Sequence, residues 1–236
     1  MIVSLVVLLM LASASSQCDR DTSTILGQVK ANGLQSLNSL HDYVWILDSH
    51  ETFRRKGKIE KHDLRRQTVV ANGQMYTRDL HPGELPTIPE SEAALSSGYH
   101  VSPALYGDCG GSPCGTYPYA FLVMITLPDL WDVLQVREGN LNGVQVLVID
   151  LQPRRLPSGA GMIAETAWVA RDRCRLLRLV QTRAKPDGHD KAEEVFEYGE
   201  IKGNWLPIRR ELRGATAEST EEYTYLKFGA FVRMRP

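Results

Sequence analysis

The sequence has no excess of charge of either sign. Lys and Arg together number 27 and Asp and Glu 28, which gives a formal net charge of −1. A protein that coats nucleic acid usually carries a strong basic excess, so this balance argues against a nucleic-acid partner. The aromatic and aliphatic content is ordinary, which excludes wholesale disorder. At 236 residues the chain is long enough for one sizeable core.

Sequence motifs of the common catalytic and metal sites are also absent. The chain has no His-Glu-x-x-His, no Gly-x-Ser-x-Gly, no Cys-x-x-Cys and no Cys-x-x-Cys-His. Residues 107–111, Gly-Asp-Cys-Gly-Gly, imitate a nucleophile loop, with His100 nearby in the sequence. A cysteine nucleophile needs a free thiolate beside a base, however, and Cys114 follows closely enough to bind Cys109 instead. We therefore expect a protein that is not an enzyme and has no cofactor and no metal.

The chain also lacks an apolar run long enough to span a bilayer, which needs about 20 residues. The apolar run Met1–Leu11 is shorter, and small residues follow it, with Ala12-Ser13-Ala14 resembling a cleavage site. No Lys or Arg precedes the run, which departs from an ordinary secretory signal. We expect residues 1–16 to be a signal peptide and residues 17–236 to be a single domain. That domain would be periplasmic or otherwise exported, and peripheral rather than integral to any membrane.

Cysteines are few: Cys18, Cys109, Cys114 and Cys174. An even number in an exported protein predicts disulfides. Cys109 and Cys114 form the expected bridge, because the Gly-Gly-Ser-Pro spacer can bring their Cα atoms within about 6 Å. A metal knuckle at this place would need two further soft ligands at fixed spacing. Cys18 either pairs with Cys174, which the sequence leaves open, or carries a lipid anchor, which Gln17 directly before it disfavours.

Short antiparallel hairpins organise most of the chain. Asn142-Gly143 lies between two strand-like runs, and an Asn-Gly pair tolerates the positive φ that a type I′ turn requires at both central positions. Val144 to Leu151, the second run, is rich in β-branched residues. Asn72-Gly73 repeats the same device. Pro207 within a later run predicts an edge strand or a bulge.

Two segments interrupt the hairpins. Residues 19–40 show helical spacing of apolar residues. From His81 onward, prolines break the sheet, Ser91–Leu95 offers a short helix, and Tyr99–Pro118 reads as a loop. The predicted fold class is α+β and mainly antiparallel β. It is a strongly curved, unclosed β-barrel of about ten strands, with an N-terminal helix and a helical and loop insertion as a lid.

The order of these segments resembles that of a known family. The resemblance covers most of the mature chain and depends on HDYVWILDSHETF (41–53), LNGVQVLVIDLQP (141–153), AWVARDRCRLLRLVQ (167–181), GEIKGNWLPIRREL (199–212) and EEYTYLKF (221–228). In these respects the chain is similar to the bacterial lipoprotein carriers of the LolA/LolB-like fold, which include outer-membrane lipoprotein-sorting proteins and RseB-type periplasmic domains. The family implies an unclosed barrel with a helical lid over a hydrophobic cavity, which binds acyl chains or lipidated partners without covalent chemistry. The Cys109/Cys114 loop departs from the family pattern, and no individual functional residue is carried over.

The expected function is therefore that of an exported carrier or sensor that binds a lipid, an acyl chain or a lipoprotein in the half-barrel. Buried acyl CH₂ groups would contribute about 0.8 kcal/mol each. The alternative is a structural or interaction module of a bacterial envelope complex, whose core its own side chains fill. An aromatic residue on a strand is more often core than ligand wall. With that reservation, the candidate cavity residues are Trp45, Tyr76, Val148, Trp168, Tyr198, Trp205 and Phe228.

Overall fold

One antiparallel sheet forms the body of the protein. The structure, a computed structural model, describes residues 18, 24–29, 31–32, 43–55, 57–71, 74–89, 92–102, 131–154, 162–184 and 191–228. Its strands are β1 (Tyr43–Arg55), β2 (Lys58–Ala71), β3 (Gln74–Asp79), β4 (His100–Ser102), β5 (Trp131–Leu141), β6 (Val144–Pro153), β7 (Met162–Ala170), β8 (Arg175–Ala184), β9 (Lys191–Ile201), β10 (Asn204–Gly214) and β11 (Ala217–Phe228). A short helix, α2 (Glu92–Gly98), precedes β4.

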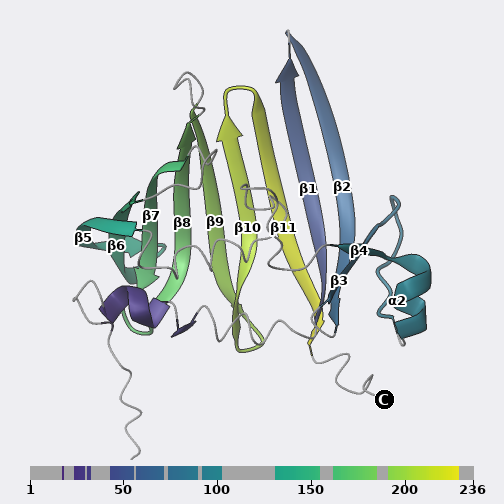
Figure 1. Cartoon of the computed structure of the whole chain (residues 1–236), viewed down its shortest axis with the longest axis horizontal. Helices are drawn as coiled ribbons and strands as arrows, with labels where there is room; N and C mark the ends of the chain where they lie inside the picture. Colours follow the sequence, from purple (N-terminus) through teal and green to yellow (C-terminus); the bar gives the residue numbers. More distant parts are fainter. Residues whose placement is uncertain are drawn as a thin grey trace, which may run out of the picture.

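The strands form two meanders that meet in the middle of the sheet. Their order is β4-β3-β2-β1-β11-β10-β9-β8-β7-β6-β5, and every neighbouring pair is antiparallel. Strand β1 pairs with β11, the last strand, so the pairing of the first and last strands joins the two meanders. The order ends at β4 on one side and at β5 on the other, so the curled sheet is not closed (Figure 1). The predicted mainly antiparallel, unclosed fold is therefore confirmed.

The hairpin turns show why these sequences reverse the chain where they do. Asn142 and Gly143 both have positive φ, 52° and 87°, as a type I′ turn requires. The Asn140 side chain accepts a hydrogen bond from the Gly143 amide at 2.8 Å. Lys202 and Gly203 repeat the conformation with φ of 51° and 81°. Pro207 lies at a register shift between β9 and β10, which is the predicted bulge.

The sheet has one strand more than the sequence predicted. Tyr99–Pro118 was expected to be a loop, but His100–Ser102 is β4, which pairs with β3. Three residues are too few to show an alternating pattern, so only the pairing reveals this strand. Within the expected N-terminal helix the structure describes residues 24–29 and 31–32 as helical.

The two faces of the sheet are covered by different elements. We call the face that carries Trp45 and Tyr225, which lie opposite each other on β1 and β11, the inner face. Three helical residues, Ile25, Leu26 and Val29, belong to the same hydrophobic cluster as this face. The other face, the outer face, packs against α2 through Leu95, in a cluster with Val44, Val69 and Tyr76. The described part of the insertion thus covers the face opposite to the N-terminal helix. Residues 103–130, the rest of the insertion, lie outside the described residues. Among the described helices, none has the length and apolar character needed to cross a membrane.

Candidate ligand-binding face

The inner face carries a continuous apolar wall. Buried residues from β5 through β11, and from β1, join in one cluster, to which Cys18 and helical residues 24–29 also belong. None of these side chains is more than 8% exposed. The strand residues of the wall are Trp45, Leu47, Trp131, Leu147, Ile149, Leu151, Ala167, Val169, Leu176, Leu179, Phe196, Tyr198, Leu206, Tyr223 and Tyr225.

A row of polar side chains crosses this wall. Neighbours in the row lie directly opposite each other on adjacent strands. The exception is Arg210 on β10 and Glu194 on β9, which an ion pair joins. All but the arginine are buried below 9% exposure, and the arginine side chain is 13% exposed. From β1 to β7 the polar row is Ser49, Glu221, Arg210, Glu194, Gln181 and Glu165.

Arg210 holds the centre of the polar row. Its Nη2 lies 2.5 Å from Glu194 Oε1 and its Nη1 lies 2.6 Å from Glu221 Oε1. Glu221 also accepts a hydrogen bond from the Tyr223 hydroxyl at 2.5 Å, and Arg183 Nη2 lies 2.8 Å from Glu194 Oε2. Burial and the neighbouring Glu221 raise the pKa of Tyr223 well above its usual value, so this hydroxyl keeps its proton. One guanidinium thus links two buried carboxylates and stabilises both.

Glu165 ends the polar row in a different environment. Its Oε1 accepts a hydrogen bond from Gln181 Nε2, while its Oε2 is buried and has no hydrogen-bond partner in the described part of the chain. Burial raises the pKa of Glu165 to about 8, and the Gln181 hydrogen bond and the Arg183 charge only partly oppose this shift. Glu165 is therefore a neutral carboxylic acid at neutral pH. The Tyr198 hydroxyl, whose pKa burial also raises, likewise lacks a hydrogen-bond partner among the described residues.

Glu165 makes the stability of the fold depend on pH. The folded pKa of about 8 lies above the ordinary value of 4.5, so the unfolded chain releases this proton first. Below the ordinary pKa, Glu165 is protonated in both states and does not lower the free energy of unfolding. Between the ordinary pKa and about 8, it lowers the free energy of unfolding by about 1.4 kcal/mol for each unit that the pH rises. We expect Glu165→Gln to remove this slope from urea-unfolding free energies measured across the range. The exposed Glu193→Gln is the control and should keep the wild-type slope; equal slopes in wild type and Glu165→Gln would contradict the assignment.

The structure places the predicted cavity residues on both faces of the sheet. Trp45 and Tyr198 lie in the inner wall. Tyr76 packs on the outer face with α2. Val148 and Trp168 lie opposite each other on β6 and β7. Alternation along these strands puts them on the outer face, because Leu147 and Val169, the next residues, are in the inner wall.

Two further candidates differ from both groups. Trp205 packs at the margin of the inner cluster, where its Nε1 donates to the Leu176 carbonyl at 2.5 Å and Arg175 lies over its ring. Phe228 ends β11, and its side chain lies outside the described residues, as do Cys109 and Cys114. A ligand-binding role for each of the seven candidates stays a prediction.

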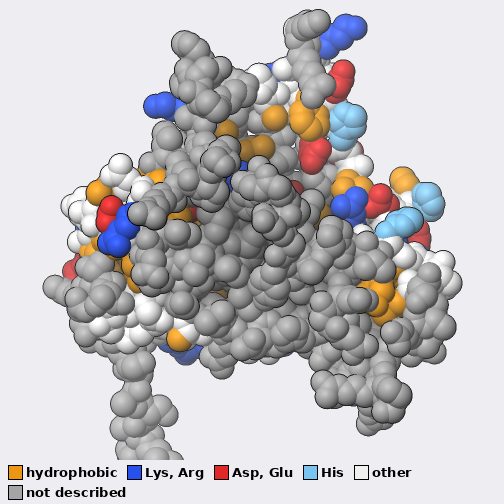
Figure 2. Space-filling model, viewed as in Figure 1, with side chains coloured by type: hydrophobic (Ala, Val, Ile, Leu, Met, Phe, Trp, Pro, Cys, Tyr) orange, Lys and Arg blue, Asp and Glu red, His pale blue; other side chains and the backbone are white. Residues whose placement is uncertain are grey.

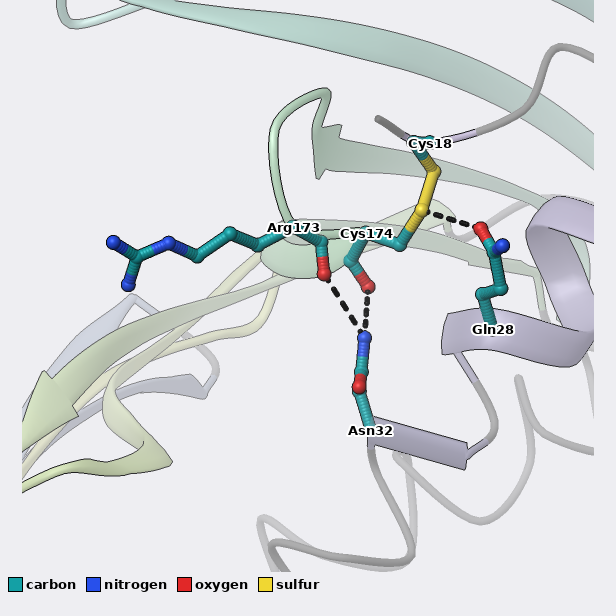
Figure 3. Close-up of a disulfide and its surroundings, with 5 residues drawn as sticks. All are labelled: Cys18, Gln28, Asn32, Arg173 and Cys174. Atoms are coloured by element: carbon teal, nitrogen blue, oxygen red, sulfur yellow. Dashed lines mark hydrogen bonds between the residues drawn. A yellow bond between two sulfur atoms is a disulfide. The ribbon is translucent and has the colours of Figure 1, made fainter. Parts of the chain in front are cut away.

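A disulfide attaches the N-terminal segment to the turn between β7 and β8. Cys18 and Cys174 are bonded across 156 residues of sequence, and the Cys18 amide donates to the Arg171 carbonyl at 2.8 Å. Figure 3 shows Asn32 donating from one Nδ2 to the carbonyls of Arg173 and Cys174, at 3.0 and 2.9 Å. The Gln28 Oε1 lies beside the Cys174 sulfur. The pairing that the sequence left open therefore exists, and a Cys18 sulfur bonded in this way is not available for a lipid thioether.

An open, polar pocket of about 420 Å³ lies at the β3–β4 edge of the sheet. Its Arg66 is paired with Asp79 at 2.7 Å and its Arg78 with Glu84 at 2.7 Å, so its charges are already balanced. Histidine side chains are visible on the side of the molecule that carries β1–β4 (Figure 2). Within the described ranges no group of three or more His, Cys, Asp or Glu side chains could hold a metal ion. The pocket is lined by Arg66, Thr77, Arg78, Asp79, His81, Glu84, Gly98 and His100.

No protein-family model matches the chain. No curated protein sequence matches it significantly either. Solved structures do resemble it. An outer-membrane lipoprotein-sorting protein domain from Vibrio parahaemolyticus is 14% identical, with a TM-score of 0.46 over 86% of this chain and 92% of that one. A LolA-superfamily protein from Nitrosomonas europaea is 12% identical, with a TM-score of 0.45 over 86% and 90%. A DUF1329-family protein from Desulfovibrio piger is 11% identical, with a TM-score of 0.42 over 85% and 92%.

At these identities and TM-scores the likenesses assign neither a family nor a ligand to this chain. The solved structures that this chain is similar to nevertheless include proteins of the kind that the sequence resembles, namely LolA-superfamily and lipoprotein-sorting proteins.

Proposed function

We propose that this chain is an exported, non-enzymatic carrier or sensor that binds the acyl chain of a lipid or lipoprotein against the inner face. The observation that supports this most is the extent of the apolar wall, which runs across eight strands. Among the described residues, the members of its cluster outside the strands are Cys18, Ile25, Leu26, Val29 and Cys174. Because the wall is already buried, an acyl chain would have to replace part of what covers it now. Each CH₂ group that the chain buried there would contribute about 0.8 kcal/mol.

Export is part of the proposal. The Cys18–Cys174 disulfide favours an oxidising compartment, because disulfides persist there and are rare in the cytosol. Residues 1–16 would be the signal peptide that is removed, and residues 17–236 the working domain. In this proposal the protein is peripheral to the membrane and carries no lipid anchor at Cys18, because the Cys18 sulfur is bonded to Cys174.

An envelope interaction module is the second candidate. The observation that favours it is the burial of the wall, since all its side chains are at most 8% exposed without a ligand. In that case the protein's own side chains fill the space, and the partner binds elsewhere on the surface. The two candidates differ in whether the inner face accepts an acyl chain.

A chain-length series separates the two candidates. We would titrate the exported, oxidised protein with dansyl-labelled alkyl chains that differ by one methylene and follow the probe's fluorescence. The carrier account expects Kd to fall about fourfold per added methylene until the wall is covered. A protein that binds no probe, or binds all of them equally weakly, supports the interaction module instead.

A pair of variants on one strand locates the binding. Ala167, which is 1% exposed, lies on the inner face of β7, and Trp168 next to it lies on the outer face. Ala167→Phe should weaken probe binding by about tenfold or more by filling the space that a chain would occupy, while Trp168→Phe should leave Kd unchanged. Urea unfolding of both variants checks that they are folded. Equal effects of the two changes would place the probe somewhere other than the inner face.

A further inference from the structure

In the polar row of the inner face, the carboxylates at the centre have ion-pair partners, whereas Glu165 at the end is hydrogen-bonded to a neutral side chain. At its centre Arg210 contacts Glu194 and Glu221 at 2.5 and 2.6 Å, and Arg183 contacts Glu194 at 2.8 Å. Two guanidinium groups thus balance two carboxylates. Glu165 lies at the end of this network and makes no ion pair of its own among the described residues. Its hydrogen bond is with the neutral Gln181 side chain, whose Oε1 accepts from Arg183 Nη2 at 3.3 Å.

One oxygen of Glu165 is available for a hydrogen bond. The side chain is 1% exposed and lies between Leu151 and Gln181 in the register, with Ala167 next to it on the same face. Oε1 already accepts from Gln181, and Oε2 has no hydrogen-bond partner in the part of the chain that the structure describes. A buried polar atom without a partner costs about 1–3 kcal/mol, so this site is incomplete.

Glu165 Oε2 acts as a hydrogen-bond donor rather than as an acceptor. Burial keeps Glu165 protonated at neutral pH, with a pKa of about 8. Because Oε1 accepts the Gln181 hydrogen, the acid proton belongs on Oε2. A neutral O–H donor among apolar side chains fits a neutral acceptor, and a carbonyl oxygen is the acceptor that acyl chains carry.

We propose that Glu165 donates a hydrogen bond from Oε2 to the carbonyl oxygen of an ester- or amide-linked acyl chain lying on the inner face. This inference rests on the proposed function and names the chemistry of its ligand. A free fatty-acid carboxylate fits the same place less well. The guanidinium charges of the polar row are already paired, and a buried charge without its own counter-ion is costly.

The experiment uses three dansyl probes with the same undecyl chain. One ends in a methyl ester, one in a free carboxylate, and one in a plain methyl group. Binding of each to the oxidised protein near pH 6 is measured by fluorescence for wild type, Glu165→Leu and Glu165→Gln. Glu165→Leu removes the donor, and Glu165→Gln keeps an N–H donor at the same place.

The ester is expected to bind wild type more tightly than the carboxylate. Glu165→Leu should weaken ester binding by about tenfold and leave the plain chain within about threefold, whereas Glu165→Gln should keep ester binding within about threefold. Ester affinity for wild type, but not for Glu165→Gln, should fall as pH rises through about 8. Gln181 and Arg183 act on Glu165, and Tyr198, whose pKa is raised by burial and then by the Glu165 charge, is coupled to it.

Three results would overturn the inference. Unchanged ester binding in Glu165→Leu, or equal losses for the ester and the plain chain, removes Glu165 as the donor while leaving the acyl-binding face intact. Failure of wild type to bind any of the three probes contradicts the proposed function itself, and the assignment of Glu165 falls with it.

Discussion

Arg210→Met is expected to lower the free energy of unfolding by about 3–5 kcal/mol near neutral pH. The side chain is 13% exposed and is the link between the carboxylates of Glu194 and Glu221, which are 1% and 9% exposed. Methionine has a similar volume but no charge, so the change leaves two buried carboxylates close together without their common partner. Removing one partner of a buried ion pair costs far more than losing an exposed one, because the remaining charge stays desolvated.

Arg213 provides the matched control on the same strand. It pairs with Glu211 and Glu193, but its side chain is 60% exposed. Arg213→Met should change the unfolding free energy by less than about 1 kcal/mol, since exposed pairs contribute little. Urea-induced unfolding monitored by tryptophan fluorescence measures both. Similar costs for the two variants would mean that the polar row is not the buried network described above.

Removal of the Cys18–Cys174 disulfide should destabilise the protein by about 2–5 kcal/mol. The bond closes a loop of 156 residues, and the chain-entropy account gives about 5 kcal/mol for a loop of this length. Both cysteines also belong to the inner-wall cluster, together with the helical residues Ile25, Leu26 and Val29. We therefore expect Cys18→Ala and Cys174→Ala to cost about the same, and the double variant to cost no more than either single variant.

Reduction tests the same bond without a substitution. A thiol reductant should lower the urea midpoint of wild type by much more than that of the double Cys18→Ala, Cys174→Ala variant, in which the expected short-loop bridge between Cys109 and Cys114 is the one left to reduce. Additive costs of the two substitutions, or a wild type indifferent to the reductant, would show that each cysteine acts through its own packing rather than through their bond.

The sequence predicted those features that depend on the conformational preferences of single residues. The Asn142-Gly143 turn and the Pro207 bulge were predicted because φ preferences and a missing N–H are properties of single residues. β4 was missed because three residues carry no periodicity, and its strand character depends on pairing with β3.

The polar row was missed because its burial depends on neighbours far away in the sequence. In the sequence, nothing distinguishes Arg210 from the other charged residues on β10. A signal was nevertheless present. Glu165, Glu194 and Glu221 each lie two residues before an inner-wall residue, at Ala167, Phe196 and Tyr223, and alternation along a strand puts the members of each pair on one face.

The disulfide shows the same limit. Cys18 and Cys174 are 156 residues apart, and spacing alone could not decide whether they pair. The bridge that spacing favoured, between Cys109 and Cys114, lies outside the described residues and stays a prediction.

The aromatic cavity candidates show a similar limit of the sequence. The candidates were apolar residues on predicted strands, and the sequence did not show which face of the sheet is covered. The structure divides them, with Trp45 and Tyr198 in the inner wall and Trp168 on the outer face.

The most direct test of the acyl-binding account is the content of the protein as cells make it. We would export the chain to an oxidising compartment, purify it without detergent, extract it with organic solvent and identify the extract by mass spectrometry. The account predicts an ester- or amide-linked acyl lipid in near-stoichiometric amount, and a smaller amount from Ala167→Phe than from Trp168→Phe. A protein that yields no lipid and takes up no dansyl-labelled chain would contradict it and leave the envelope interaction module as the function to pursue.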